Sequence, residues 1–180
     1  MTEKNLTSNG PSDPEDDYIK SWLRSLTILH RGHWDAARYY DKVNLGLGLA
    51  TAIAAAISGT TAFTQLQSQA EEGTLNTWLQ VGIGIFALLA ASLGAAQAFM
   101  RPSELSARHK LAGQKYGKLR REIELAFYLG LPDQQEKKET FLTEFRLKWE
   151  AADEESLPVP EKIYKSVEAD YKNRTPRINV

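Results

Sequence analysis

The chain has 180 residues, with 22 Lys and Arg against 23 Asp and Glu, and a formal net charge of -1. It contains no cysteine, which excludes a disulfide framework, a thiolate nucleophile and any cysteine-ligated zinc or iron-sulfur site. The balance of charge argues against a dedicated nucleic-acid binder, which usually carries a basic excess. These averages hide an uneven distribution, because Glu71 and Glu72 are the only charged residues between positions 43 and 100.

The N-terminal part is predicted to be a polar, disordered segment over 1–12 followed by a helix over 13–42. Asp13 is a suitable N-cap, and Pro14 suits the first helical position. Apolar and histidine positions then alternate spacings of four and three, which is typical of a coiled-coil seam: Ile19, Leu23, Leu26, His30, His33, Ala37 and Tyr40. No helix breaker lies between Gly32 and Asn44, so the helix is expected to continue into the next segment.

Two charge-free windows follow, 43–70 and 73–100, each of 28 residues. Each exceeds the roughly 20 residues that a helix needs to cross a bilayer. We expect a first transmembrane helix over 43–66, an external loop over 67–77 and a second transmembrane helix over 78–100. The alternative is an apolar hairpin buried in a larger soluble bundle, but the outer segments are too short to wrap two fully apolar helices.

Basic residues flank both windows and are absent from the loop between them. The positive-inside rule therefore places both termini in the cytoplasm. The first apolar stretch begins too late and is too long for a cleavable signal peptide. After the second window, basic residues are expected to contact anionic headgroups, with nucleotide binding left open for part of this run: Arg101, Arg108, Lys110, Lys118, Arg120 and Arg121.

Small residues recur in both windows at the spacing that lets helices pack closely in lipid: Gly48, Ala52 and Ala56, then Ala91, Gly94 and Ala98. The windows hold no ionisable side chain, which disfavours a proton relay, a voltage sensor and transporter chemistry. Mildly polar side chains either hydrogen-bond within the helix pair or line a water-filled path in an oligomer: Thr51, Ser58, Thr61 and Ser92.

A juxtamembrane helix over 101–130 is expected to restart at Pro102 and to carry a second seam that includes His109, Tyr116 and Leu119. Helices over 132–172 and a tail over 173–180 follow. The predicted fold is an all-α membrane protein, in which an antiparallel two-helix transmembrane hairpin is extended by cytoplasmic helices into a helical bundle or stalk.

The chemistry-bearing residues indicate no enzyme. His30, His33 and His109 lie on the seams among Leu, Ala and Tyr, without the further donors that a metal or catalytic site needs. We expect them to pack between helices. No phosphate-binding glycine loop and no nucleophile set is recognisable, so no catalytic residue, metal or cofactor is predicted.

With this order of segments the chain resembles the SLATT family, the SMODS and SLOG-associating two-transmembrane effectors. The resemblance covers roughly residues 21–124. Before the first span it depends on Trp34, Ala37 and Tyr40, and after the second on Pro102, Leu105 and Arg120 together with the pattern His109-x3-Gly113-x2-Tyr116-x2-Leu119.

The resemblance implies a homo-oligomeric pore-forming effector of bacterial anti-phage defence in the inner (cell) membrane. A nucleotide second-messenger synthase, a nucleotide sensor or a reverse transcriptase would be its partner, since the chain has no room for a sensor domain. Two alternatives stay open: a membrane-anchored scaffold that recruits a partner through Phe141, Phe145 and Trp149, and a holin-like or stress-response membrane protein.

Overall fold

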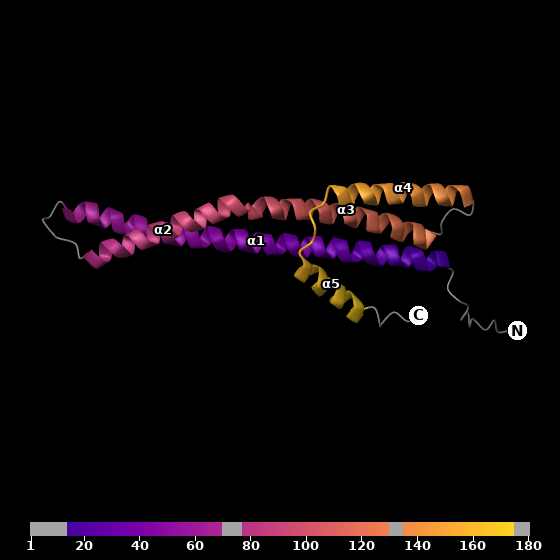
Figure 1. Ribbon diagram of the computed structural model, residues 1–180, viewed down its shortest axis with the longest axis horizontal. Helices are drawn as coiled ribbons and strands as arrows, with labels where there is room; N and C mark the ends of the chain where they lie inside the picture. Colours follow the sequence, from indigo (N-terminus) through magenta and orange to yellow (C-terminus); the bar gives the residue numbers. More distant parts are fainter. Residues whose placement is uncertain (1–13, 70–76, 130–134, 175–180) are drawn as a thin grey trace. The chain divides into compact units, whose positions relative to one another are not determined.

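A computed structural model describes residues 14–69, 77–129 and 135–174 of the chain. Within these ranges the secondary structure is helical and contains no strand, which confirms the all-α prediction. The helices are α1 (Pro14–Gln69), α2 (Thr77–Met100), α3 (Pro102–Leu129), α4 (Gln135–Glu154) and α5 (Glu161–Arg174) (Figure 1).

α1 is one continuous helix of 56 residues. It joins the two segments expected over 13–42 and 43–66, and it continues to Gln69, into the stretch expected to be a loop. α5 ends at Arg174, two residues into the predicted tail. The proposed N-cap Asp13, the predicted disorder over 1–12 and most of the predicted loop and tail lie outside the described residues.

The chain divides into two compact units, which are described separately. The terminal unit comprises the residues up to Trp34 and those from Leu111 onward. The central unit comprises Asp35–Lys110. The terminal unit therefore holds the first part of α1, most of α3, α4 and α5, whereas the central unit holds the rest of α1, α2 and the first residues of α3.

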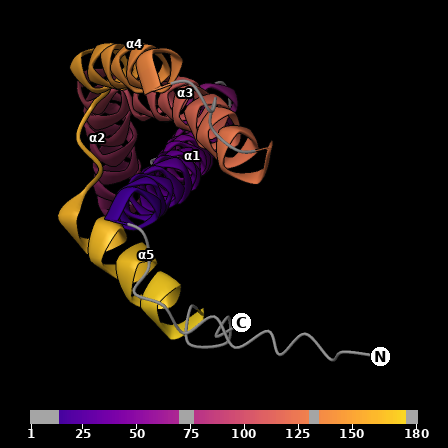
Figure 2. The same ribbon diagram turned by 90° about the vertical axis from the view of Figure 1, so that its right-hand side faces the viewer.

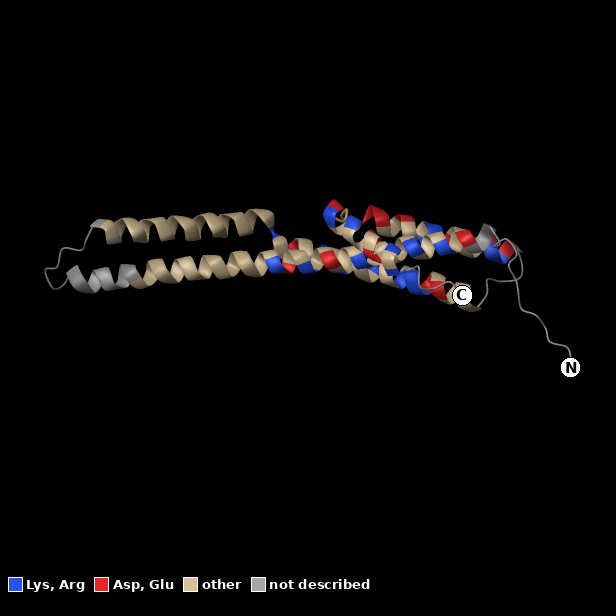
Figure 3. Ribbon diagram, turned by 90° about the horizontal axis from the view of Figure 1, so that it is seen from below, with Lys and Arg blue, Asp and Glu red and all other residues tan. Residues whose placement is uncertain are grey.

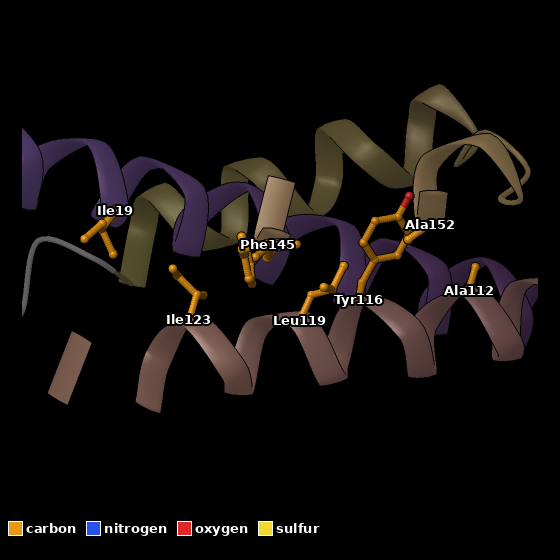
Figure 4. Close-up of a cluster of buried hydrophobic side chains, with 8 residues drawn as sticks. Ile19, Ala112, Tyr116, Leu119, Ile123, Phe145 and Ala152 are labelled. Atoms are coloured by element: carbon orange, nitrogen blue, oxygen red, sulfur yellow. The ribbon is translucent and has the colours of Figure 1, made fainter. Parts of the chain in front are cut away.

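The core of the terminal unit lies between α1, α3 and α4 (Figure 2). Phe145 of α4 is fully buried, and its ring lies 5.5 Å from that of Trp22 in a stacked arrangement. Burying one such side chain contributes about 1.5–3 kcal/mol. The buried cluster, most of which is shown in Figure 4, consists of Ile19, Leu26, Ala112, Tyr116, Leu119, Ile123, Phe145 and Ala152.

α1 and α3 approach each other closely at two glycines of α3. A Cβ atom at Gly113 would lie 3.1 Å from the Trp34 ring, and one at Gly117 would lie 2.9 Å from the His30 ring. His30 Nδ1 lies 2.8 Å from the carbonyl oxygen of Gly113. Because a carbonyl only accepts, this ring nitrogen carries the proton. Because Gly113 and Gly117 have no side chain, the aromatic rings of α1 can pack directly against the α3 backbone.

α5 and the segment before it contact the other side of α1 in the terminal unit. Val159 lies 3.2 Å from the position of a Cβ atom at Gly32. Arg31 pairs with Asp170 at 3.2 Å and Arg24 with Glu168 at 3.5 Å. These ion pairs are partly exposed and contribute at most about 1 kcal/mol each.

We predict that Gly117→Ala lowers the stability of the terminal unit. The added methyl group would overlap the His30 ring, and overpacking of this kind costs about 1–3 kcal/mol. Thermal unfolding of the detergent-solubilised chain, followed by circular dichroism, measures the effect. Gly84→Ala is the control, since nothing lies within 4 Å of a Cβ atom there. Equal melting temperatures for the two variants would contradict the close approach.

Candidate membrane-spanning helices and helix seam

Two helical stretches, Asp17–Thr60 and Gln80–Leu129, each contain a segment long and apolar enough to cross a membrane. This confirms the prediction of two such helices. Only 6% of the first segment and 0% of the second is buried by the rest of the described chain. Figure 3 shows no charged residue in the described part of α1 beyond residue 42 or in α2. In the described structure these segments are therefore not core helices covered by protein.

Within the central unit, α1 and α2 contact each other through polar and small residues. Gln97 Nε2 donates a hydrogen bond to Asn44 Oδ1 at 3.0 Å. The same amide lies 3.6 Å from the position of a Cβ atom at Gly48, and the Thr51 methyl group lies 3.8 Å from that position at Gly94. A side-chain amide pair and two glycines thus mark the contact between the helices.

The predicted helix-packing residues divide between two environments. Gly48 and Gly94 are half-buried at the contact between α1 and α2. The other four are exposed: Ala52 and Ala56 on α1, and Ala91 and Ala98 on α2. The contact within the pair therefore involves these two glycines, and these four alanines lie on the outer surface of the central unit.

The mildly polar residues suggested to line a pore all hydrogen-bond to their own helix where they are described. Thr51 donates to the carbonyl of Leu47 at 2.8 Å, and Ser58 to that of Ala54 at 2.9 Å. Both are half-buried. Ser92 donates to the Leu88 carbonyl at 2.8 Å and is exposed. The side chain of Thr61 lies outside the described residues.

The seam within the central unit joins the start of α3 to α1. The buried His109 ring stacks on Tyr40 with 5.5 Å between ring centres, and burial lowers the pKa of His109. Close by, the Ser106 hydroxyl donates to Asp41 Oδ1 at 2.6 Å, and Lys110 Nζ lies 2.8 Å from Asp41 Oδ2. The hydrogen bond from Lys110 lowers the pKa of the Asp41 carboxyl most, and the hydrogen bond from Ser106 lowers it further.

The seam within the terminal unit places His33 against Tyr116, with 5.1 Å between the stacked rings. The Tyr116 hydroxyl donates to Asp153 Oδ1 at 2.5 Å. Burial, followed by this hydrogen bond, raises the pKa of Tyr116. The phenol is therefore a proton donor that links α3 to α4, and Leu119 lies one turn further in the core. The three histidines all contact aromatic or backbone groups of the facing helix.

The six basic residues predicted to lie at the membrane surface are split between the two units. In the central unit, Arg101 and Arg108 both pair with Glu104, at 3.5 and 2.6 Å, and Lys110 pairs with Asp41. The remaining three belong to the terminal unit: Lys118 and Arg121 are exposed, and Arg120 lies 4.0 Å from Glu124. Three of the six residues thus lie in each unit, and four of them form ion pairs: Arg101, Arg108, Lys110 and Arg120.

Sequence reasoning missed several residues that make these contacts. Asn44, the partner of the mildly polar Gln97, lies near the start of the first charge-free window, where a polar residue facing the second helix could have been sought. Gly117 follows Gly113 at the spacing of close helix contacts. Ser106 and Asp153 carry no recognisable signal. In the described parts of the chain no three His, Asp or Glu side chains come together as a metal site.

Comparisons of the chain with known protein families, with curated proteins and with solved structures found no match.

We predict that Asn44 and Gln97 are energetically coupled. Polar contacts between helices in lipid contribute about 0.6 kcal/mol on average and at most about 1.7 kcal/mol. Unfolding of Asn44→Leu, Gln97→Met and the double variant in mixed micelles gives the coupling energy. Pairing Asn44→Leu with Ser92→Ala should give none, because Ser92 bonds to its own helix. Strictly additive effects of the first pair would refute the contact.

Proposed function

We propose that the chain spans a membrane twice, as an antiparallel hairpin of α1 and α2. The observation that supports this most directly is the lack of burial of the two apolar segments. Leu45 and Leu88 are 71% and 70% exposed. Exposed apolar surface costs about 25 cal/mol per Å² in water, so hydrocarbon is the favourable surrounding. Helices also satisfy their own backbone hydrogen bonds, as a lipid environment requires.

The proposed orientation has both ends of the chain in the cytoplasm. Lys42 immediately precedes the first apolar segment and Arg101 immediately follows the second. The connecting segment carries Glu71 and Glu72 and no basic residue. This asymmetry is the one that the positive-inside rule uses.

We expect a reporter inserted between Glu71 and Glu72 to be periplasmic. A phosphatase fusion at this point should be active and a fluorescent protein dark, while fusions after Val180 should give the reverse pattern. Lys42→Glu combined with Arg101→Glu should weaken this preference, because both charges that flank the spans change sign. A cytoplasmic reporter in the unchanged chain would refute the orientation.

Assembly of several copies is part of the proposal, since two helices cannot enclose a pore. The exposed alanines of the central unit offer a surface for it: Ala52 and Ala56 on α1, and Ala91 and Ala98 on α2. Small residues let helices of separate copies approach closely, which is how helices associate in lipid. The glycines contact within the pair and are not needed for this surface.

The activity proposed for this assembly is leakage of the bacterial inner membrane during anti-phage defence. Its support is the resemblance of residues 21–124 to the SLATT effectors, together with the absence of charged side chains from the apolar windows. Activation would come from a separate partner protein, of the nucleotide-synthase, nucleotide-sensor or reverse-transcriptase kind. The terminal unit, with its own packed core, is the part that such a partner would address.

The scaffold alternative has less support from the positions of its residues. It relies on Phe141, Phe145 and Trp149 as a recruiting surface. Phe145 is fully buried, and the other two pack against the same core. A scaffold would therefore need another surface of the terminal unit.

We predict that the purified chain releases a trapped dye from liposomes once assembled, and that Ala56→Leu and Ala91→Leu reduce the release. A loss of about 1.4 kcal/mol per contact would lower assembly about tenfold. Ala50→Leu is the matched control, because Ala50 is exposed on α1 but is not on the stripe of Ala52 and Ala56.

Adding the partner protein, if a neighbouring gene encodes one, should increase dye release by the unchanged chain. If dye is retained under every condition and the chain stays monomeric in detergent, the pore proposal fails. Equal release by Ala50→Leu, Ala56→Leu and Ala91→Leu would instead show that the alanines are not the assembly surface.

A further inference from the structure

An open groove of about 370 Å³ lies between α3 and α4 of the terminal unit. Its apolar lining residues are Leu119, Ala151 and Ala152, and its charged lining residues are Lys115, Lys118, Glu122, Lys148 and Glu155. The volume is at the lower end of the about 300–1,000 Å³ that is usual for ligand sites. The groove thus has both apolar and charged lining residues.

Two ion pairs join the sides of the groove, one from α3 to α4 and one from α3 to Glu155, the residue that follows α4. Lys115 pairs with Glu155, and Lys148 pairs with Glu122 at 2.5 Å. Lys115 and Glu122 lie seven residues apart on α3, so both pairs start from the same face of that helix. Each pair gives its lysine a carboxylate partner.

The middle of the groove lacks such an ion pair. Lys118 lies between the two pairs along α3, and the facing residues of α4 are Ala151 and Ala152. Neither alanine offers a carboxylate, and their small side chains leave the space that forms the groove. Lys118 is exposed and makes no ion pair within the described residues.

The charges around the groove therefore do not cancel. Lys115 and Lys148 each pair with a carboxylate, whereas the ammonium of Lys118 has no such partner among the described residues and lies beside the apolar lining residues. An anion placed there would form an ion pair with Lys118, and an apolar body attached to the anion would cover Leu119 and the two alanines. Charged hydrogen bonds beside an apolar surface are stronger than those in open water.

We propose that this groove binds a small organic mono-anion, in which one carboxylate, sulfonate or phosphate ester contacts Lys118 and an apolar body covers Leu119, Ala151 and Ala152. The apolar lining comprises only these three residues, which matches a small apolar body and not two acyl chains, so we assign the occupant as a free molecule. The inference does not depend on membrane leakage, because every residue of the groove belongs to the terminal unit.

The test uses the full chain in nanodiscs of zwitterionic lipid and 1-naphthoate as the probe, with binding measured by calorimetry against empty discs. We expect saturable binding of naphthoate and none of the neutral 1-naphthamide. Lys118→Met keeps the apolar stem but removes the charge and should weaken binding about tenfold, as expected for loss of one charge-assisted hydrogen bond. Ala151→Leu should block binding by filling the groove.

Lys162→Met is the matched control, since Lys162 is an exposed lysine of α5 outside the groove. Its affinity for naphthoate should equal that of the unchanged chain. Ala151 is exposed on α4, so its replacement leaves the core intact. Equal binding of naphthoate and naphthamide, or unchanged affinity in both groove variants, would overturn the proposal. Loss of naphthoate binding in discs that contain anionic lipid would overturn the assignment to a free molecule.

Discussion

The apolar side chains of α1 and α2 that no other described part of the chain covers impose the main constraint on this protein. Phe99 is 90% exposed, and Leu45 and Leu88 are 71% and 70% exposed. In water this surface would cost about 25 cal/mol per Å², whereas in hydrocarbon it costs nothing. Hydrocarbon also removes the hydrophobic drive for the helices to associate, so contacts between them must rely on close fit and on polar pairs. The glycines and the Asn44–Gln97 amide pair meet that requirement in the central unit.

The two units use α1 in different ways, as the proposed membrane position of the central unit would require. In the terminal unit, α1 contributes Trp22 and Leu26 to a core of large side chains, as expected where burial from water stabilises the packing. Its rings also pack against the glycines of α3. In the central unit the same helix presents small and mildly polar residues, whose hydroxyls bond to their own backbone. A hydroxyl satisfied in this way adds little cost in an apolar surrounding.

Helical periodicity made the helices and much of the core predictable. The seam spacing identified Leu26, His33 and Tyr116 as inward positions, and these side chains are buried. Composition was a weaker guide to direction within the apolar helices. Gly48 and Ala52 belong to one stripe of small residues, yet only Gly48 lies at the contact with α2. In segments that are apolar all round, no hydrophobic face marks the inner side, so polar pairs such as Asn44 with Gln97 carry that information.

The junction of α2 and α3 shows how a local backbone rule shapes the central unit. Pro102 is buried at the first position of α3 and disfavours helical geometry in the residue before it. Arg101, the residue before it, adopts φ 45°, a left-handed conformation that glycine usually occupies. Its N–H still bonds to the Gln97 carbonyl and its own carbonyl accepts from Leu105, so one residue ends α2 and begins α3. Glycine would relieve the backbone strain here, but it would remove the cation that pairs with Glu104 and that follows the second apolar segment. The cation that follows the second apolar segment and the turn that starts α3 thus belong to a single residue, at a conformational cost of about 1 kcal/mol.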